Sequence, residues 1–324
     1  MKNLILVFII ISFFSCKRTN YKTLSGNAFG TTYHIKIEDS SKTKWKTTID
    51  SLINAVNKSL STYIKTSDIS RINKGDTTVI IDEKFKEVFN KSMRIFKETN
   101  GVFDPTIGVL VNAWDFGPEK KLKNLDSVTI NELMKQVGFN KVSIINDKVK
   151  KQNPKTYLDF NAIAKGYGID IIGRFLEQQN INNYMIEIGG ELRVRGKNDK
   201  NLDWNIQIEK PNFDGTQSGL KTVRLHNESM ATSGTYRKYK VDKNGNRYAH
   251  ILNTKTGYPS KSNLLSASVI ANLDCADVDA YATTLMAFGL ERSKVFLQQH
   301  KELKVFLIYV DSNGELQTFM SDGF

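Results

Sequence analysis

Segments with the two-residue period of a strand and segments with the period of a helix follow one another irregularly along this 324-residue chain. Residues 28–39, AFGTTYHIKIED, alternate as a strand does, whereas residues 45–60, WKTTIDSLINAVNKSL, repeat apolar side chains at helical spacing. Asp82 can cap a second helix, and further helices are expected over about 163–179 and 277–288. A doubly wound sheet needs regular strand–helix alternation, so this order predicts an α+β fold with mixed, largely antiparallel sheets and flanking helices.

The second half of the chain is rich in expected strands. The runs NNYMIEIGGELRVRG, WNIQIEK, KTVRLHN and LLSASVIAN have strand character, and DKNG at 242–245 and DSNG at 311–314 are typical of hairpin turns. No linker clearly divides the chain. We therefore expect residues 25–324 to form one domain with two lobes.

The N-terminus has the composition of an export signal. A single basic residue precedes the apolar run LILVFIIISFF, which is too short to span a membrane with margin. The Ser-Cys that follows resembles a bacterial lipoprotein signal, which implies removal of residues 1–15, lipidation of Cys16 and a tether over 16–24. An uncleaved anchor helix is the alternative. We expect an exported bacterial lipoprotein that is anchored to a membrane and faces the periplasm.

Cysteine content and charge exclude several classes. Once Cys16 is lipidated, Cys275 is the remaining thiol, so no internal disulfide framework is possible and a buried residue is expected. The net charge is +12, but the lysines are scattered and no nucleic-acid motif is present. Solubility or a preference for membrane surfaces is favoured over an anionic partner, and no nucleic-acid partner is expected.

Polar side chains that could take part in catalysis or metal binding gather near the ends of the expected elements. Phosphate-loop, zinc-protease, serine-hydrolase and CxxC signatures are absent. Asp279 and Thr283 lie four residues apart and would share one helix face, where their oxygens suit Mg²⁺. A capping Asp and a buried Thr explain the pair about as well. Asp277 would point away from Asp279, so we expect it to be a cap or to support the site from behind.

Eight stretches, in this order, resemble the ApbE family of bacterial FAD:protein FMN transferases across essentially the whole mature chain. They are AFGTTYHIKI, LSTYIKTSDISRIN, GVFDPTIGVLVNAW, LDFNAIAKGYGID, IEIGGELRVRG, ATSGTYRKY, YAHILNTKTGYP and ADVDAYATTLMAFG. The resemblance implies an α+β fold with flavin in a cleft between two lobes. It implies Mg²⁺-dependent transfer of FMN from FAD to a Thr or Ser hydroxyl of an acceptor redox protein, with release of AMP. Acceptors in this family include subunits of Nqr- and Rnf-type electron-transfer complexes.

The resemblance also implies functional residues at the matching positions. Contacts with FAD are expected from Phe29, which stands where many members have Met, and from Tyr63, Val102, Phe103, Asp104, Asp159, Lys165 and His250. Metal ligands are expected from the main-chain oxygen of Ala162 and from the side chains of Asp279 and Thr283. The metal bound by Asp279 would polarise the phosphate bond, which makes this residue catalytic by implication.

Roles within the expected site follow from side-chain chemistry. Lys165 would add positive charge near the phosphates, and Asp159, at a strand end, would accept hydrogen bonds from the ligand. Gly166 and Gly168 each cost about 1 kcal/mol in a helix, and are expected to let the backbone approach the ligand and metal. His250 is expected to act as a general base or to position the phosphate, unless it only packs on the flavin. An FAD pyrophosphatase and a non-catalytic FAD-binding lipoprotein remain alternatives.

Overall fold

The computed structural model describes residues 20–119, 121–122, 125–212, 214, 216, 218–236, 239–241 and 247–324. Its α-helices are α1 Trp45–Leu60, α2 Asp68–Asn73, α3 Glu83–Glu98, α4 Gly108–Ala113, α5 Ser127–Met134, α6 Ala164–Gln178, α7 Cys275–Phe288 and α8 Leu290–Gln299. Its strands are β1 Tyr21–Ala28, β2 Thr31–Glu38, β3 Val142–Ile145, β4 Lys148–Lys151, β5 Tyr184–Ile188, β6 Glu191–Arg195, β7 Trp204–Glu209, β8 Gly219–Leu225, β9 Ser229–Gly234, β10 Tyr239–Val241, β11 Arg247–Ala249, β12 Leu264–Ala271, β13 Lys304–Val310 and β14 Leu316–Met320. The export signal, Cys16 and the DKNG turn lie outside the described residues.

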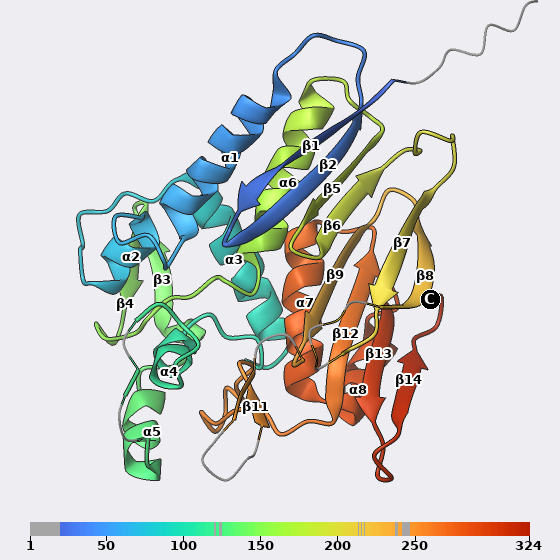
Figure 1. Ribbon diagram of the computed structural model, residues 1–324. Coiled ribbons are helices and arrows are strands. Elements are labelled where there is room, and N and C mark those ends of the chain that lie inside the picture. The colour runs from blue at the N-terminus through green and yellow to red at the C-terminus, as the bar shows by residue number, and fades with distance from the viewer. Residues whose placement is uncertain are drawn as a thin grey trace, which may run out of the picture.

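An eight-stranded sheet with the order β1-β2-β5-β6-β9-β12-β13-β14 forms the framework (Figure 1). Every neighbouring pair of its strands is antiparallel. The alternation expected in β2 is present, since Tyr33, Ile35 and Ile37 are buried and the residues between them are exposed. Most of these strands are joined by hairpins or cross without a helix, so the α+β prediction is confirmed.

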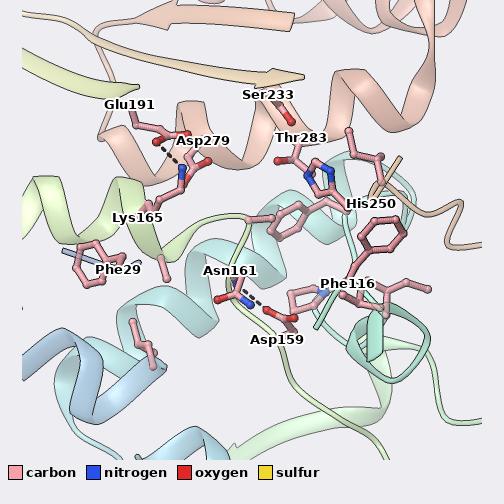
Figure 2. Close-up of a pocket in the computed structure, with 18 of the residues that line it drawn as sticks. Phe29, Phe116, Asp159, Asn161, Lys165, Glu191, Ser233, His250, Asp279 and Thr283 are labelled. Atoms are coloured by element: carbon pink, nitrogen blue, oxygen red, sulfur yellow. Dashed lines mark hydrogen bonds and ion pairs between the residues drawn. The ribbon is translucent and has the colours of Figure 1, made fainter. Parts of the chain in front are cut away.

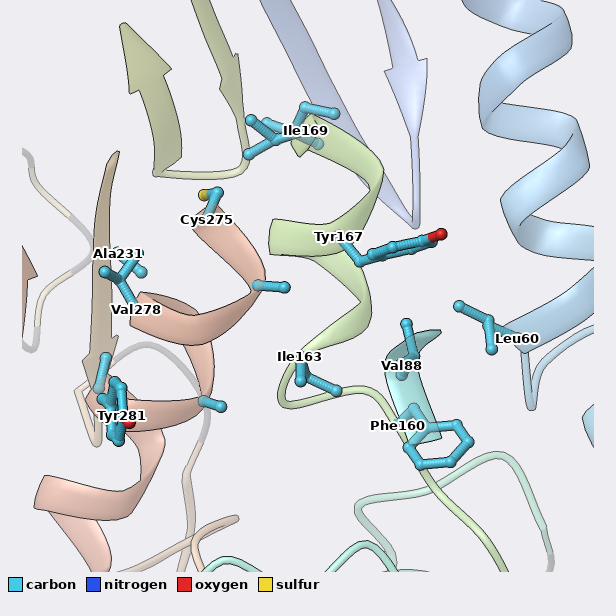
Figure 3. Packing of buried hydrophobic residues seen from close by; sticks show 14 of the residues in the cluster. Leu60, Val88, Phe160, Ile163, Tyr167, Ile169, Ala231, Cys275, Val278 and Tyr281 are labelled. Atoms are coloured by element: carbon cyan, nitrogen blue, oxygen red, sulfur yellow. The ribbon is translucent and has the colours of Figure 1, made fainter. Parts of the chain in front are cut away.

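The helices cover one face of this sheet and enclose the main hydrophobic core. In Figure 1, α6 and α7 run along the sheet, with α1 against α6 and α3 against α7. Figure 3 shows Tyr167 extending from α6 toward Leu60 of α1, while Cys275 and Val278 of α7 lie on the opposite side of α6. All four residues are buried in the same cluster, so the position of α6 between α1 and α7 is fixed by apolar packing.

Two smaller clusters complete the interior. On the other sheet face, the β7–β8 hairpin covers a cluster that includes Trp204, Leu225 and Phe306. A separate cluster joins α4 and α5 to the segment near Leu252 through Leu110, Ile130 and Val137. We call the sheet with its covering helices the large lobe, and the elements of this last cluster the small lobe.

Local signals in the sequence match the observed element ends closely. The helix expected at 163–179 spans 164–178, and the one expected from Asp277 begins two residues earlier at Cys275. The Asp82 side chain caps α3 by accepting a hydrogen bond from the Phe85 N–H at 2.9 Å, as predicted. The DSNG segment joins the antiparallel strands β13 and β14, also as predicted. Among the described helices, none combines the length and the apolar character that a membrane span requires.

Candidate active site

A cavity of about 820 Å³ lies between the two lobes. The large lobe contributes walls from the β1–β2 turn, the end of α1, the start of α6, and α7. The small lobe contributes the 102–116 segment and the 250–254 segment. Its lining includes all the expected flavin and metal residues: Phe29, Tyr63, Val102, Phe103, Asp104, Asp159, Ala162, Lys165, His250, Asp279 and Thr283. The chain thus brings them together from distant segments, while their individual roles remain predictions.

The two glycines at the start of α6 allow close packing within the protein, while their expected role of letting the backbone approach a ligand and metal stays a prediction. A Cβ at Gly166 would overlap the backbone carbonyl of Cys275, so the glycine allows α6 and α7 to cross in close contact. A Cβ at Gly168 would overlap the ring of Phe29. Asp170, further along α6, accepts hydrogen bonds from the N–H groups of Cys275 at 2.8 Å and Ala276 at 2.9 Å. The beginning of α7 is therefore held directly by α6.

Asp279 alters the first turn of α6. The Gly166 N–H would complete that turn by bonding the Ala162 carbonyl, but it donates instead to Asp279 Oδ2 at 3.1 Å. The next residue follows the helical pattern, since the Tyr167 N–H donates to the Ile163 carbonyl at 3.0 Å. The Ala162 carbonyl therefore does not accept the hydrogen bond from the Gly166 N–H that a regular α-helix would give it. Its residue lines the cavity together with Asp279.

Three charged side chains meet at this end of the cavity. Figure 2 shows Lys165 ion-paired with Glu191, with Asp279 beside them. Burial raises the pKa of Glu191, and the nearby Asp279 adds to this, whereas Lys165 opposes it. Burial also raises the pKa of Asp279, against the opposing effects of Lys165 and the Gly166 N–H. For Lys165, burial alone would lower the pKa, but the two carboxylates outweigh it and the pKa is raised.

Asp104 holds the start of the small lobe together. Its Oδ1 accepts hydrogen bonds from the Thr106 N–H at 2.8 Å and the Thr106 hydroxyl at 2.5 Å, and Oδ2 accepts from the Phe139 N–H at 3.3 Å. Burial raises the pKa of Asp104, against these hydrogen bonds. The carboxylate lies at the cavity wall, and its hydrogen bonds with Thr106 and Phe139 hold the turn that follows Val102 and Phe103.

Asp159 lies in an irregular segment, which corrects the expectation that it ends a strand. Residues 158–160 carry no strand, and the Asp159 N–H donates to the Pro105 carbonyl at 2.8 Å. Its Oδ1 accepts a hydrogen bond from the Asn161 N–H at 2.8 Å, as Figure 2 shows. Tyr63, which also lines the cavity, follows α1 with 58% of its surface exposed. An exposed aromatic ring at a cavity mouth provides a surface on which a planar ligand can stack.

His250 and Thr283 face the cavity from different lobes. His250 follows β11, and its ring makes an edge contact with Phe116 at 6.2 Å between ring centroids. Thr283 lies one turn after Asp279 on α7, and both line the cavity, as their spacing predicted. Asp277, in contrast, is paired with Lys91 at 2.8 Å and is absent from the cavity lining, which agrees with a supporting position behind the site.

Sequence reasoning missed Glu191 and Phe116. The sequence offers no local signal for Glu191, because a carboxylate that alternates with the apolar residues Leu192 and Val194 is expected to face solvent. In the structure Leu192 and Val194 pack in the cluster under the β7–β8 hairpin, and Glu191 is buried with Lys165 of α6. Phe116 offers no signal either, since it follows a short helix by a loop.

Comparisons with known proteins agree with this geometry. The ApbE family model matches residues 29–307. The FAD:protein FMN transferase of Haemophilus influenzae is 37% identical over 328 residues, which cover 97% of this chain and 94% of that protein. The flavin transferase ApbE from Vibrio cholerae has a TM-score of 0.84 at 32% identity, with 94% of this chain and 98% of that chain covered. The apo flavinyl transferase ApbE of Pseudomonas stutzeri gives a TM-score of 0.83 at 27% identity, with 94% and 95% covered.

The family model spans most of the chain, and the relatives extend over nearly its full length. The solved structures share its sheet, its helices and its overall arrangement at TM-scores above 0.8. The resemblance read from the eight sequence stretches is therefore confirmed, and this chain belongs to the ApbE family.

Proposed function

We propose that this protein is an FAD:protein FMN transferase, which moves the FMN part of FAD onto a Thr or Ser hydroxyl of an acceptor protein. The hydroxyl oxygen forms a bond to the flavin-side phosphorus, and the bond from that phosphorus to the bridging oxygen breaks. AMP leaves with the bridging oxygen, and the hydroxyl proton passes to a base. The Haemophilus influenzae relative is an FAD:protein FMN transferase, which supports this assignment.

The observation that carries the proposal is that several oxygen donors and a cation line the same cavity. Ala162, Asp279 and Thr283 can offer a carbonyl, a carboxylate and a hydroxyl, and Lys165 lies near Asp279. Phosphoryl transfer depends mainly on alignment and charge neutralisation, so this donor set suits a pyrophosphate substrate. A purely flavin-binding protein would have no need of it.

The same donor set fits a hard divalent cation such as Mg²⁺. Oxygen ligands are what Mg²⁺ takes, and the carbonyl of Ala162 is released from the helix by the Asp279–Gly166 hydrogen bond. Among the described residues, no group of three or more His, Cys, Asp or Glu side chains is placed to hold a metal ion, so a site of this mixed type is the candidate. When bound there, Mg²⁺ supplies charge neutralisation of the phosphates and of the AMP leaving group.

The chain's own residues supply binding and proton transfer. Lys165 places positive charge at the phosphate end, and Tyr63 and Phe29 offer aromatic surfaces to the flavin. His250 lies in the cavity wall, where its imidazole accepts the proton of the incoming Thr or Ser hydroxyl. The walls of both lobes shield the phosphates from water, which favours a protein hydroxyl over hydrolysis.

The test is a reconstituted transfer reaction. The full chain in detergent is incubated with FAD, Mg²⁺ and an acceptor domain with a Thr flavinylation motif, such as one from an Nqr- or Rnf-type subunit. Intact-protein mass spectrometry follows FMN on the acceptor, and chromatography follows AMP. Mg²⁺-dependent FMN attachment with equal release of AMP is expected. Free FMN with unmodified acceptor would indicate an FAD pyrophosphatase, and intact bound FAD a binding protein.

We also propose that the protein works at a membrane, as an exported lipoprotein facing the periplasm. The proposal rests on the sequence of residues 1–16, with Cys16 as the lipidated residue. Cys16→Ser should release the protein from the membrane fraction of a bacterial host, whereas Cys275→Ser should leave it there. Retention of the Cys16→Ser protein in the membrane would favour an uncleaved anchor helix instead.

A further inference from the structure

Glu191 is a buried carboxylate in the cavity wall that has no part in the transfer reaction described above. Its side chain is 5% exposed, and that of its partner Lys165 is 30% exposed. Asp279, also buried, acts on the same ammonium. Two buried carboxylates therefore lie near one cation, which is ion-paired with Glu191, and each would be costly to bury without it.

The three groups differ in how firmly they are held. Glu191 begins β6 directly after the tight turn at 189–190, where both glycines have positive φ angles of 62° and 104°. Asp279 is fixed by its hydrogen bond from the Gly166 N–H. Lys165 is ion-paired with Glu191 near Asp279 and ends a flexible four-carbon stem, so its ammonium is the charge that can move.

A divalent cation at Asp279 would compete with the ammonium for the same carboxylate, because like charges repel strongly at short range in a buried site. Glu191 offers the ammonium an alternative partner on the side of β6. With Glu191 ionised, Lys165 can keep a full ion pair while Asp279 turns to the cation. Without it, Lys165 would have only Asp279 to neutralise its charge.

We propose that Glu191 is a positioning residue that draws the Lys165 ammonium away from Asp279 and so sets the affinity of the site for divalent cations. This inference rests on the metal site of the proposed function. Glu191 need not touch the cation or the substrate, because it acts through Lys165.

A double-mutant cycle on cation binding tests the proposal without any measurement of activity. The full chain in detergent at pH 8, without FAD, is titrated with Mn²⁺, and free Mn²⁺ is followed by electron paramagnetic resonance. The four proteins are the wild type, Glu191→Gln, Lys165→Met and the double variant. Glu191→Gln should weaken Mn²⁺ binding by about tenfold or more in the wild-type background, as expected for an uncompensated neighbouring charge. In the Lys165→Met background the same change should alter the Kd by no more than about threefold.

A matched control comes from another carboxylate–lysine pair. Glu228 pairs with Lys304 at 2.5 Å, with its side chain 13% exposed, and is absent from the cavity lining. Glu228→Gln should leave Mn²⁺ binding unchanged. Thermal unfolding in EDTA checks that each variant is folded. Tight Mn²⁺ binding by the double variant would show independently that the protein tolerates glutamine at position 191.

The outcomes separate this inference from the one on which it rests. Equal weakening by Glu191→Gln in both backgrounds would show that the carboxylate acts on the cation directly, and would overturn the positioning role. Unchanged binding in the single Glu191→Gln variant would overturn it as well. If the wild type itself binds no Mn²⁺, the metal site is absent and this inference fails with it, whereas the transfer reaction is judged separately by FMN attachment to the acceptor.

Discussion

At the scale of single residues, His250 is the side chain on which the proton transfer depends. Its ring lies in the cavity wall and makes an edge contact with the Phe116 ring. His250→Gly should lower kcat for FMN transfer by about a hundredfold or more, because a general base contributes rate in that range. The measurement is steady-state transfer to the acceptor domain, with FAD binding followed separately by fluorescence.

Phe116→Leu provides the comparison for His250. This change removes the aromatic neighbour but retains the imidazole, so it should raise KM while kcat changes by no more than about threefold. Unaltered turnover of His250→Gly would remove its catalytic role and leave it as a flavin contact.

The glycines of α6 allow a second prediction at this scale. A methyl group at Gly168 meets the Phe29 ring, whereas one at Gly166 meets the α7 backbone. Gly168→Ala should lower the free energy of unfolding by about 1–2 kcal/mol, and Gly166→Ala by about 3 kcal/mol, because overpacking against backbone cannot be relieved by a side-chain rotation. Urea unfolding measures both.

Phe29→Ala separates these two cases. In its background Gly168→Ala should become neutral or stabilising, since alanine is the better helix former once the overlap is gone. Gly166→Ala should remain destabilising in both backgrounds. If Phe29→Ala relieved both substitutions equally, the close crossing of α6 and α7 would not be what requires Gly166.

At the scale of elements, the first helix depends on a carboxylate outside it. Lys44, at the start of α1, provides no side-chain cap. Asp39, after β2, instead accepts hydrogen bonds from the Trp45 indole at 2.5 Å and from Lys22 of β1 at 2.7 Å. Burial alone would raise the pKa of Asp39, but these bonds and those from Ser41 outweigh it and hold the pKa well below its ordinary value.

Asp39→Asn should therefore reduce stability in a pH-dependent manner. A carboxyl whose folded pKa is lowered contributes stability above its unfolded pKa of about 4, and that contribution is lost as the pH falls through the folded pKa. We expect a loss of about 2–3 kcal/mol at pH 7, with the difference from wild type shrinking below about pH 4. Chemical unfolding at several pH values measures this.

Asp126 offers a control for that prediction, because it caps α5 through the Thr129 N–H at 2.8 Å from an exposed position. Asp126→Asn should cost little, since asparagine caps a helix nearly as well. A pH-independent difference for Asp39→Asn would mean that its carboxylate is not the stabilising group.

Elements were more predictable from the sequence than the contacts between them. Apolar periodicity and the Asp82 cap located α1 and α3, and the spacing of Asp279 and Thr283 placed both on one face of α7. The packing roles of Gly166 and Gly168 were not predicted, because they depend on which elements lie against α6. These are α7 at Gly166 and the Phe29 ring at Gly168, and a single sequence does not encode such contacts locally. Glu191 was missed for the same reason, since its partner Lys165 lies in another element.

At the scale of the whole molecule, the cavity joins two lobes that have separate hydrophobic clusters. A ligand that spans it should stabilise both, because binding to the folded state alone adds about 2.7 kcal/mol when the ligand is at a hundred times its Kd. We expect FAD with Mg²⁺ to slow amide hydrogen exchange in α4 of the small lobe and at the start of α6 in the large lobe. Mass spectrometry of the exchanged peptides measures this.

The β7–β8 hairpin is the internal control for that experiment, because it covers the opposite face of the sheet. Amide hydrogen exchange in this hairpin should slow only to the extent that the ligand makes global unfolding of the protein rarer. Protection restricted to the large lobe would contradict a flavin site that lies between the lobes.

The charged group of Lys165, Glu191 and Asp279 has a consequence for how the protein would change under selection. Well-packed apolar residues in place of buried ion pairs are often as stable or more stable, and without Asp279 the Gly166 N–H would be free to complete the first turn of α6. A library of variants selected only for resistance to heat should therefore lose these three residues early. Under selection for flavin transfer they should persist, so the site is a place where heat tolerance and activity favour opposite sequences.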